Sequence, residues 1–416
     1  MTLTMSDYFK ARLRAMASPQ IVVLSSLFPN SFQPMAGLFV RERMFRVAQH
    51  LPLTVVAPVP WFPLQSLVRR IRPGFRPGAP GTETQKGITV FHPRFFSVPG
   101  AFKSLDGFFM ALACWPRMRR LKRQKQLDII DAHFAYPDGY AATLLGRWFN
   151  VPVTITLRGT ETRHAKDPAL RPLVIKALTR AARVFSVSDS LRQIALSCGI
   201  DTAKLQVVGN GVDIAKFAPQ PKASARAALG VAPAAKVIVT VGGLVERKGF
   251  HRVIAAMPEL LDQFPGLIYL VIGGPSPEGD VTTQLRQQVA DLQLSDAVRF
   301  LGPLAAEKLS LPLSAADVFV LSTRNEGWAN VLLEAMACGL PVVATDVGGN
   351  SEVVSTTSLG AIIPFDNHTA LVGAIAASLQ KDWDRQAIRA YAEANTWDNR
   401  VSALVKEFRS LVSARH

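Results

Sequence analysis

The chain has 416 residues, of which 49% are hydrophobic, so it can bury the cores of two or three domains of ordinary size. Gly and Pro, at 28 residues each, are too few for a low-complexity chain, and three widely spaced cysteines exclude a disulfide framework or a cysteine metal site. The net charge of +16 is uneven, because residues 1–213 carry 29 Lys and Arg against 12 Asp and Glu while the remainder is close to neutral. This asymmetry indicates an anionic partner of the first half.

Short β-branched runs alternate with helical stretches along the chain. In the first half, we predict strands at Ile21–Leu24, Leu53–Ala57, Asp128–Ala132, Val153–Leu157 and Val184–Val187, and helices that include Gly37–His50, Asp138–Phe149 and Ser190–Cys198. In the second half, the predicted strands are Val237–Val241, Leu267–Ile272, Val298–Leu301, Asp317–Leu321 and Pro341–Ala344. Nearly continuous apolar strands separated by helices are typical of parallel sheets covered on both faces, so the sequence predicts two doubly wound α/β domains.

Two proline-rich stretches interrupt this alternation. Lys216–Pro233 contains Pro219, Pro221 and Pro233 among small residues and is predicted to hold the domain boundary. Trp61–Gly87 is rich in proline and basic residues and is predicted to be an irregular excursion from the first domain.

The strongest chemical signal is Glu326-Gly-Trp-Ala-Asn-Val-Leu-Leu-Glu334, which follows a predicted strand. The first carboxylate precedes a helix and the second lies inside it, Gly327 permits close backbone approach, and Asn330 is expected to be the N-cap. A helix start beyond a parallel strand suits a phosphorylated ligand, whose sugar hydroxyls could donate to the carboxylates. On spacing alone, a capped helix with solvated acids is an equally good interpretation.

A second signal, Gly242-Gly243-Leu-Val-Glu-Arg247-Lys248-Gly249, directly follows the predicted strand Val237–Val241. The glycines allow a tight turn, and Arg247 or Lys248 can reach a diphosphate. A Gly-Gly turn alone is weak evidence, but the strand, the basic pair and the expected helix strengthen it.

These segments resemble the family-4 retaining glycosyltransferases of the GT-B fold. The Glu-x7-Glu stretch, which runs on to Thr345, is that family's hallmark, and similar segments are Val187-Ser188, Gly209–Asp213, Ile272–Pro275 and Phe300–Gly302. The resemblance covers about Ile21 to the C-terminus. It implies two Rossmann-like domains facing across a cleft, an acceptor-binding domain at 1–215 and a nucleotide-sugar-binding domain at 216–397, with a C-terminal helix at 398–416 that returns to the first.

The resemblance also implies roles for individual residues. Glu334 would bind the ribose hydroxyls, Glu326 would contact the donor sugar, and Lys248 would pair with the diphosphate. The family often has Arg where Gly243 stands, which leaves open whether Arg247 compensates for the missing charge. The donor site would further include Gly37, Gly243, Gly273, Gly274, Phe300, Gly327, Ala329, Asn330 and Val331.

The first domain resembles the subset of this family that builds bacterial surface polysaccharides, such as teichuronic acid and exopolysaccharides. Pro34–Arg43 looks like its N-terminal glycine loop, and Asp131–Gly139 looks like the loop that carries an active-site histidine, here His133. Arg158 and Glu161 stand where many members have His-Gly-x-Asp, which implies a place on the acceptor side. The alternatives are a core or helix-capping histidine for His133 and a structural ion pair for Arg158 and Glu161.

Apolar and basic residues mix at Tyr8–Arg14, Trp61–Arg76 and Phe102–Lys125. Apolar anchors beside Lys and Arg suit an anionic bilayer surface, although ordinary helices with solvated charges have the same pattern. The longest apolar runs, such as Phe108–Trp115, are far shorter than the roughly 20 residues that span a membrane. The sequence therefore predicts a cytoplasmic protein, peripheral at the inner face of the cell membrane.

No metal is expected, because the single Asp-x-Asp, Asp382-Trp-Asp384, lies among basic residues in a helical pattern and is interpreted as a solvated helix face. The combined prediction is a transferase that moves a sugar from a nucleoside-diphosphate donor to a hydroxyl of a glycan, and in particular of a lipid-linked glycan. One alternative is a sugar-nucleotide epimerase of the same fold, which the Glu326–Glu334 segment opposes, and another is a soluble anionic acceptor. Nucleic acid is not expected as a partner, because it would explain the charge but not the two glutamates.

Overall fold

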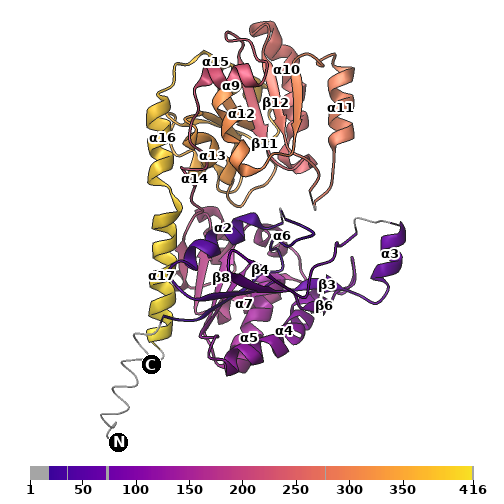
Figure 1. The fold of residues 1–416 in the computed structure, drawn as a ribbon, viewed down its shortest axis with the longest axis vertical. Helices are drawn as coiled ribbons and strands as arrows, with labels where there is room; N and C mark the ends of the chain where they lie inside the picture. Colours follow the sequence, from indigo (N-terminus) through magenta and orange to yellow (C-terminus); the bar gives the residue numbers. More distant parts are fainter. Residues whose placement is uncertain (1–17, 35, 72–74, 277, 415–416) are drawn as a thin grey trace, which may run out of the picture. The chain divides into compact units, whose positions relative to one another are not determined.

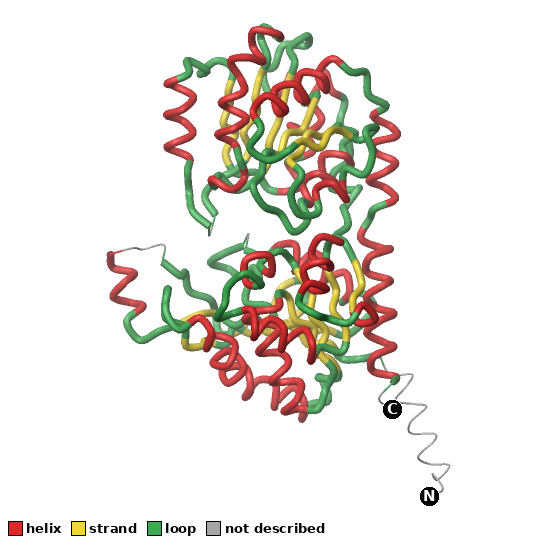
Figure 2. The backbone as a smooth tube through the Cα atoms, turned by 180° about the vertical axis from the view of Figure 1, so that it is seen from behind, coloured by secondary structure: helices red, strands yellow, loops and turns green. Residues whose placement is uncertain are grey.

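The computed structural model describes residues 18–34, 36–71, 75–276 and 278–414. The chain folds into two compact units, one formed by residues up to Asn210 together with those from Asn399 onward, and the other by Gly211–Asp398. Each unit is a largely parallel sheet with helices on its faces (Figures 1 and 2). This confirms the predicted fold of two doubly wound α/β domains.

The first unit is built on an eight-stranded sheet in the order β10-β9-β8-β7-β1-β2-β5-β4. All neighbouring strands are parallel except β4 and β5, which form an antiparallel hairpin at one edge. A separate parallel pair joins β3 and β6. The strands are β1 (Ile21–Leu24), β2 (Leu53–Val56), β3 (Val59–Trp61), β4 (Thr82–Gln85), β5 (Ile88–Phe91), β6 (Arg94–Phe96), β7 (Ile129–His133), β8 (Val153–Leu157), β9 (Arg183–Ser186) and β10 (Leu205–Val207).

The helices of the first unit are α2 (Leu38–Val47), α3 (Gln65–Ile71), α4 (Asp106–Arg123), α5 (Tyr140–Phe149), α6 (Glu161–His164), α7 (Arg171–Arg180), α8 (Asp189–Ser197) and the greater part of α17 (Trp397–Ser413). Leu404 and Phe408 of α17 are buried in one core with Ile21, Met44 and Phe185, and the rings of Phe185 and Phe408 lie 6.2 Å apart. The C-terminal helix therefore packs on the first sheet, as the family resemblance implies.

The second unit is built on a six-stranded, fully parallel sheet in the order β13-β12-β11-β14-β15-β16. Alternate residues of one strand enter separate cores, since Val237 and Val239 pack on one face and Ile238 on the other. The strands are β11 (Val237–Val241), β12 (Ile268–Ile272), β13 (Val298–Gly302), β14 (Val318–Leu321), β15 (Val342–Thr345) and β16 (Gly360–Ile363). The helices are α9 (Lys222–Ala228), α10 (Phe250–Gln263), α11 (Thr282–Asp291), α12 (Ser310–Ala315), α13 (Asn330–Ala337), α14 (Asn350–Val353), α15 (His368–Gln380) and α16 (Arg385–Ala394).

Two local predictions were wrong. Trp61–Gly87 is not irregular throughout, because it contains α3 and β4, whose mostly polar sequence Thr-Glu-Thr-Gln has no hydrophobic strand pattern. Asp382 and Asp384 do not lie on a helix face but in the loop between α15 and α16, where Asp384 Oδ1 accepts the Ala387 N–H at 2.9 Å and caps α16. The basic and apolar segment Tyr8–Arg14 lies outside the described residues.

Each sheet has one point where the strand order reverses. In the first unit the chain winds from β1 outward through β2 and then from β7 outward through β8, and in the second unit it winds from β11 through β12 and then from β14 through β15. The loops that leave the carboxyl ends of the two central strands diverge at such a point and leave a crevice, which is the usual ligand site of this architecture.

Candidate active site

The two motifs singled out in the second unit, Gly242–Gly249 and Glu326–Glu334, meet at its switch point, the place where the strand order of the sheet reverses. Lys248, which follows β11, donates from Nζ to Oε1 of Glu326, which follows β14, at 2.6 Å. Arg247 Nη1 donates to the same oxygen at 3.2 Å, and Thr323 Oγ1 lies 3.3 Å from it. The side chains of Lys248 and Glu326 are mostly shielded from solvent. Residues some 78 positions apart thus form one charged cluster where a ligand is expected.

Arg247 is held mainly by an acidic residue that the sequence did not single out. Its Nε and Nη2 donate to the two carboxylate oxygens of Glu278 at 2.8 and 2.7 Å, and its Nη1 also donates to the Asn325 carbonyl at 2.8 Å. These bonds with Glu278, together with Glu326, raise the pKa of Arg247. The guanidinium is therefore fixed in place next to Lys248.

Glycines let the loops of this site pack backbone against backbone. Gly348 has φ +56°, and a Cβ there would lie 1.6 Å from the Glu326 carbonyl oxygen. Gly273 has φ +155°, and its Cβ would lie 1.8 Å from the Gly242 carbonyl oxygen. A backbone bond also joins the loops that contain Gly243 and Gly274, since the Leu244 N–H donates to Gly274 O at 2.8 Å. At Gly243 a Cβ would approach Ser276 Cβ to 3.0 Å, so the arginine common in the family would need Ser276 to move.

The helix that ends the Glu-x7-Glu segment begins at Asn330, so the prediction of Asn330 as N-cap was wrong. The N-cap is Ala329, whose side chain has no acceptor for a capping hydrogen bond. Gly327 precedes the helix, Val331 lies in its first turn, and Glu334 is half-buried in its second turn. The predicted Phe300 lies on β13 with the Arg286 guanidinium 4.5 Å from its ring centroid.

In the first unit, His133 ends β7 and is fully buried, with an exposure of 0%. Its Nδ1 accepts from Arg158 Nε at 3.2 Å, so the ring proton lies on Nε2, which is 3.3 Å from Asp131 Oδ2. Burial and the Arg158 charge lower the pKa of His133 to about 4, against the opposing effect of Asp131. His133 is therefore neutral and orients Arg158, and in this arrangement it has no exposed atom for a substrate.

Arg158 is the centre of this buried cluster. Besides His133, its Nη1 donates to Asn210 Oδ1 at 3.0 Å, and its guanidinium lies 5.2 Å from the ring centroid of Phe39. Burial lowers the pKa of Arg158, with Arg43 acting in the same direction. Asn210 lies in the family-like segment Gly209–Asp213, but it was assigned no role from the sequence, because no local pattern indicates a contact with Arg158, 52 positions away.

Glu161 binds backbone rather than the Arg158 guanidinium. It accepts the N–H groups of Ala135 at 2.8 Å, Arg158 at 3.1 Å and Gly159 at 2.8 Å. The buried carboxylate thereby ties the loop after β7 to the loop after β8. Gly37, the other predicted residue of this unit, precedes α2 with φ +67°, where a Cβ would lie 2.2 Å from the Leu27 carbonyl oxygen.

Asp138 is a further buried acid that the sequence did not single out. Its carboxylate accepts the backbone N–H of Ser26, which follows β1, and the Ser26 hydroxyl at 3.0 Å. It therefore joins the loops at the switch point between β1 and β7. Burial raises its pKa to about 7, although the bonds from Ser26 oppose the shift.

The described residues offer neither a clustered metal site nor a membrane span. Among them, no group of three or more His, Cys, Asp and Glu side chains is placed to hold a metal ion. None of the described helices combines the length and hydropathy needed to cross a bilayer.

Family models and curated relatives agree on one class of enzyme. The model described as Glycosyl transferases group 1 matches residues 221–395, and the model described as Glycosyltransferase Family 4 matches residues 66–216. A D-inositol 3-phosphate glycosyltransferase of Geodermatophilus obscurus is 34% identical over 351 residues, which cover 79% of this chain and 77% of that protein. A glycosyltransferase of Bacillus subtilis named for teichuronic acid biosynthesis, TuaC, is 29% identical over 80% of this chain and 82% of its own.

Solved structures of low sequence identity share the fold. Sucrose-phosphate synthase from Thermosynechococcus elongatus superposes with a TM-score of 0.77 at 21% identity, over 95% of this chain and 100% of that chain. Anabaena HepE in complex with UDP superposes with a TM-score of 0.71 at 21% identity, over 94% of this chain and 100% of that chain. At this identity the superpositions support the fold alone.

Proposed function

The chain belongs to glycosyltransferase family 4 and has the GT-B fold, and on this basis we propose that it transfers a sugar, with retention of anomeric configuration, from a nucleoside diphosphate to an acceptor hydroxyl. The observation that carries the proposal is the Lys248–Glu326 contact at the switch point of the second sheet. Two cations beside one carboxylate suit a ligand that has both a diphosphate and sugar hydroxyls.

The cations of this site stabilise the leaving diphosphate. As the bond between the anomeric carbon and the phosphate oxygen breaks, negative charge grows on the diphosphate, and Lys248 lies where it can stabilise that charge. Lys248 uses one of its three N–H donors on Glu326, so it can bind phosphate without losing the carboxylate. The acceptor oxygen attacks from the same face, and its proton passes to the departing phosphate, so the enzyme mainly positions the reactants.

The donor assignment draws support from the named ligands of related structures. HepE of Anabaena has been solved with UDP and with UDP-glucose, and we propose a nucleoside-diphosphate sugar for this chain as well. The test is a panel of sugar nucleotides incubated with and without polyprenyl-linked and soluble acceptors, with release of the nucleoside diphosphate as readout. Acceptor-dependent release, with NMR showing the donor's anomeric configuration in the product, is expected. Conversion of the sugar nucleotide without acceptor would instead reveal an epimerase.

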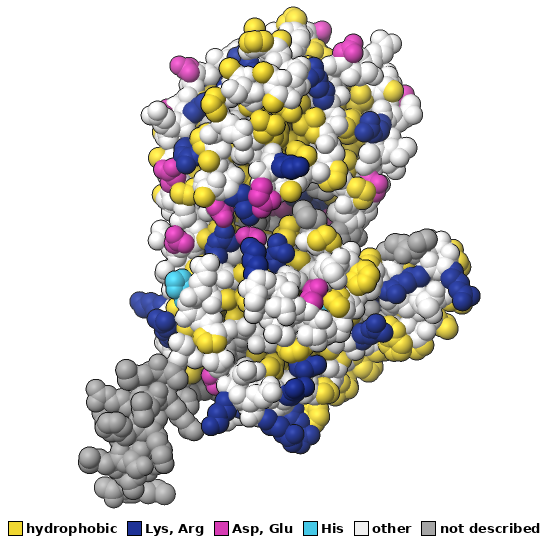
Figure 3. All heavy atoms as spheres, in the orientation of Figure 1, with side chains coloured by type: hydrophobic (Ala, Val, Ile, Leu, Met, Phe, Trp, Pro, Cys, Tyr) yellow, Lys and Arg dark blue, Asp and Glu magenta, His cyan; other side chains and the backbone are white. Residues whose placement is uncertain are grey.

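We propose a lipid-linked glycan of bacterial surface polysaccharide biosynthesis as the acceptor, because the first unit has an apolar surface. Among the described residues, all large exposed apolar side chains except Leu292 lie in the first unit. The exposed Leu105 directly precedes α4, and Phe108, Leu112 and Trp115 lie along its solvent side, while Met110 and Met118 occupy its buried side. Figure 3 shows apolar side chains along one margin of this unit out to α3, with Lys and Arg at both ends of that margin. Such a pattern fits a protein that rests on a membrane surface.

Two matched leucine variants test the membrane contact. Leu112 on α4 is 47% exposed, and Leu292 in the second unit is 39% exposed. Leu112→Ser should weaken binding to vesicles that contain anionic lipid, because it removes apolar area from the docking face, and Leu292→Ser should leave it unchanged. Equal binding by both variants and the wild type would contradict this membrane face.

A soluble phosphorylated acceptor is the second candidate, and the names of several relatives favour it. D-inositol 3-phosphate glycosyltransferases of Geodermatophilus obscurus and Corynebacterium urealyticum are 34% and 33% identical to this chain. The basic first half would suit such an anionic acceptor equally well. Turnover with inositol 3-phosphate but not with lipid-linked glycans would select this second candidate.

A further inference from the structure

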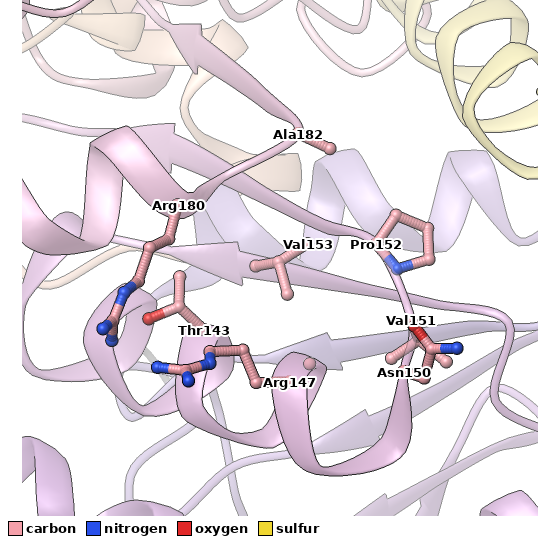
Figure 4. A pocket seen from close by; sticks show the side chains of 9 residues that line it. Thr143, Arg147, Asn150, Val151, Pro152, Val153, Arg180 and Ala182 are labelled. Atoms are coloured by element: carbon pink, nitrogen blue, oxygen red, sulfur yellow. The ribbon is translucent and has the colours of Figure 1, made fainter.

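A cavity of about 300 Å³ opens in the first unit at the amino ends of β8 and β9, away from the site residues described above (Figure 4). Its wall is formed by α5 from Thr143 onward, the residues that lead into β8, Arg180 at the end of α7, and Ala182, which precedes β9. The catalytic candidates of this unit follow the carboxyl ends of β7 and β8. At about 3.3 Å per residue, the length of β8 separates the two places by roughly 13 Å.

Two arginines line this cavity, and no acidic side chain does. Figure 4 shows the guanidinium groups of Arg147 and Arg180 on the same side of the cavity, with the Thr143 hydroxyl directed toward that side. Among the described residues, neither arginine has a carboxylate within ion-pair distance. Two guanidinium groups that share a cavity without a carboxylate repel each other, and an anion between them would remove that repulsion.

Arg180 adds a second observation. Its Nη1 atom is buried and has no hydrogen-bond partner among the described residues. A buried donor without an acceptor is unfavourable, more so when the donor is charged, so native structures rarely leave one unsatisfied. An acceptor supplied by a ligand would satisfy it.

The ends of the two helices do not account for this arrangement. Arg147 and Arg180 lie in the last turns of α5 and α7, where a cation complements the helix dipole. That effect requires only an exposed charge near each helix end. It explains neither the shared cavity nor the buried Nη1 of Arg180.

We propose that this cavity binds the phosphoryl group of a small phosphorylated ligand. Guanidinium groups present paired N–H donors that match phosphate oxygens. The volume reaches the lower end of the range for small-molecule sites, so it has room for more than a bare ion. The phosphoryl group can come from a soluble metabolite or from a lipid headgroup, because α5 itself has the exposed Trp148 and packs against α4, whose C-terminal end is basic.

The experiment measures binding of inorganic phosphate to the full-length protein by calorimetry. We expect saturable binding that Arg180→Gln and Arg147→Gln each weaken at least about tenfold, the size of one lost charge-assisted hydrogen bond. Lys86→Gln removes one positive charge from the hairpin at the opposite edge of the same sheet and should leave the affinity unchanged. Absence of saturable binding, or an affinity that both arginine variants retain, would overturn the proposal.

A second experiment, with vesicles, distinguishes a soluble phosphorylated ligand from a lipid headgroup. Vesicles of phosphatidylcholine with and without phosphatidic acid are compared for the wild type and Arg180→Gln. If Arg180→Gln weakens phosphate binding and also weakens binding to phosphatidic acid, and phosphate competes with the vesicles, the site takes a lipid headgroup. If phosphate binding falls while vesicle binding is unchanged, the site takes a soluble phosphorylated ligand. Folding of each variant is checked by its thermal unfolding midpoint.

Discussion

The two cations of the donor site are adjacent in sequence, yet their contacts give them different capacities. Arg247 already donates four hydrogen bonds, to Glu278, Glu326 and the Asn325 carbonyl. Lys248 donates to Glu326 alone among the described residues and keeps two donors for a ligand. We therefore expect Lys248, rather than Arg247, to take the charge that the family often places at the position of Gly243.

Lys248→Ala should lower kcat by roughly 100-fold, with a smaller effect on donor binding, because the charge on the diphosphate grows as the bond breaks. The fold should tolerate the change, since Arg247 continues to neutralise Glu326 at 3.2 Å. Steady-state kinetics measures this, with Lys308→Ala as a control that removes an exposed lysine of the same unit. A rise in KM alone would show that Lys248 binds donor and transition state equally, and an unchanged rate would move the role to Arg247.

Asp138 links pH to stability. Its pKa of about 7 in the folded protein is higher than the usual value of 3.8, so the fold favours the protonated acid. The stabilisation is complete below pH 4 and is lost as pH rises to 7, with a total of roughly 4 kcal/mol at 1.36 kcal/mol per pKa unit. His133 has the opposite sign, because its lowered pKa gives stability that is lost as pH falls from 6.5 toward 4.

Asp138→Asn should isolate the contribution of Asp138 to the pH dependence of stability. The amide retains an acceptor for the Ser26 N–H and cannot ionise, so the free energy of unfolding of this variant relative to the wild type should rise between pH 4 and pH 8. Urea unfolding at several pH values measures the difference, and His133 cancels because both proteins contain it. A difference that stays constant with pH would mean that Asp138 is not the group that titrates.

At the scale of elements, the loops that follow β14 and β15 are held together by a glycine. Gly348→Ala should destabilise the second unit by at least about 1 kcal/mol and lower activity, because its Cβ would overlap the Glu326 carbonyl oxygen and its φ is +56°. Gly373→Ala is the matched control, since it lies within α15 with no atom within 4 Å of the added Cβ and should stabilise by about 0.5–1 kcal/mol. Chemical unfolding and turnover measure both. Equal stability of the two variants would show that the loop adapts.

The sequence predicts those elements whose signal is local. Every predicted strand is present with ends within one residue, because buried parallel strands are continuous apolar runs such as Val237–Val241. The strands β3, β4, β5, β6, β10 and β16 were not predicted. Of these, β4 and β10 are edge strands whose polar or half-buried residues have no such pattern. The Lys248–Glu326 contact and the Arg158–Asn210 bond could not be predicted from spacing, because the sheet order brings those residues together.

At the scale of the whole molecule, catalysis should not depend on a divalent metal. The single Asp-x-Asp is a helix cap and a loop residue, and the cations beside Glu326 are Lys248 and Arg247. Dialysis against EDTA should therefore leave the turnover number within about twofold of the untreated enzyme, since protein cations can stabilise a leaving phosphate. Loss of activity that Mg²⁺ or Mn²⁺ restores would contradict this prediction.

The uneven charge of the molecule leads to a prediction about its binding to anionic membranes. Residues 1–213 carry 29 Lys and Arg against 12 Asp and Glu, and the described residues place part of this excess at the C-terminal end of α4. Replacing Arg119, Arg120 and Arg123 by Gln should weaken binding to anionic vesicles by roughly 3 kcal/mol, at about 1 kcal/mol for each basic residue near the surface. Lys122 is kept, because its Nζ donates to the Leu127 carbonyl at 3.2 Å.

Binding of the wild type should fall as salt rises, because exposed charges are screened within about 8 Å at physiological ionic strength. A control that replaces the exposed Lys86, Lys406 and Arg409 by Gln loses the same charge from the same unit and should retain most of the binding. Affinity for the sugar nucleotide should survive in both variants, since Lys248, Glu326 and Glu334 lie in the other unit. Equal losses of vesicle binding in the two variants would mean that the total charge of the unit, rather than the position of α4, determines the binding. Equal binding of the wild type to neutral and anionic vesicles would favour a soluble anionic acceptor as the explanation of the basic first half.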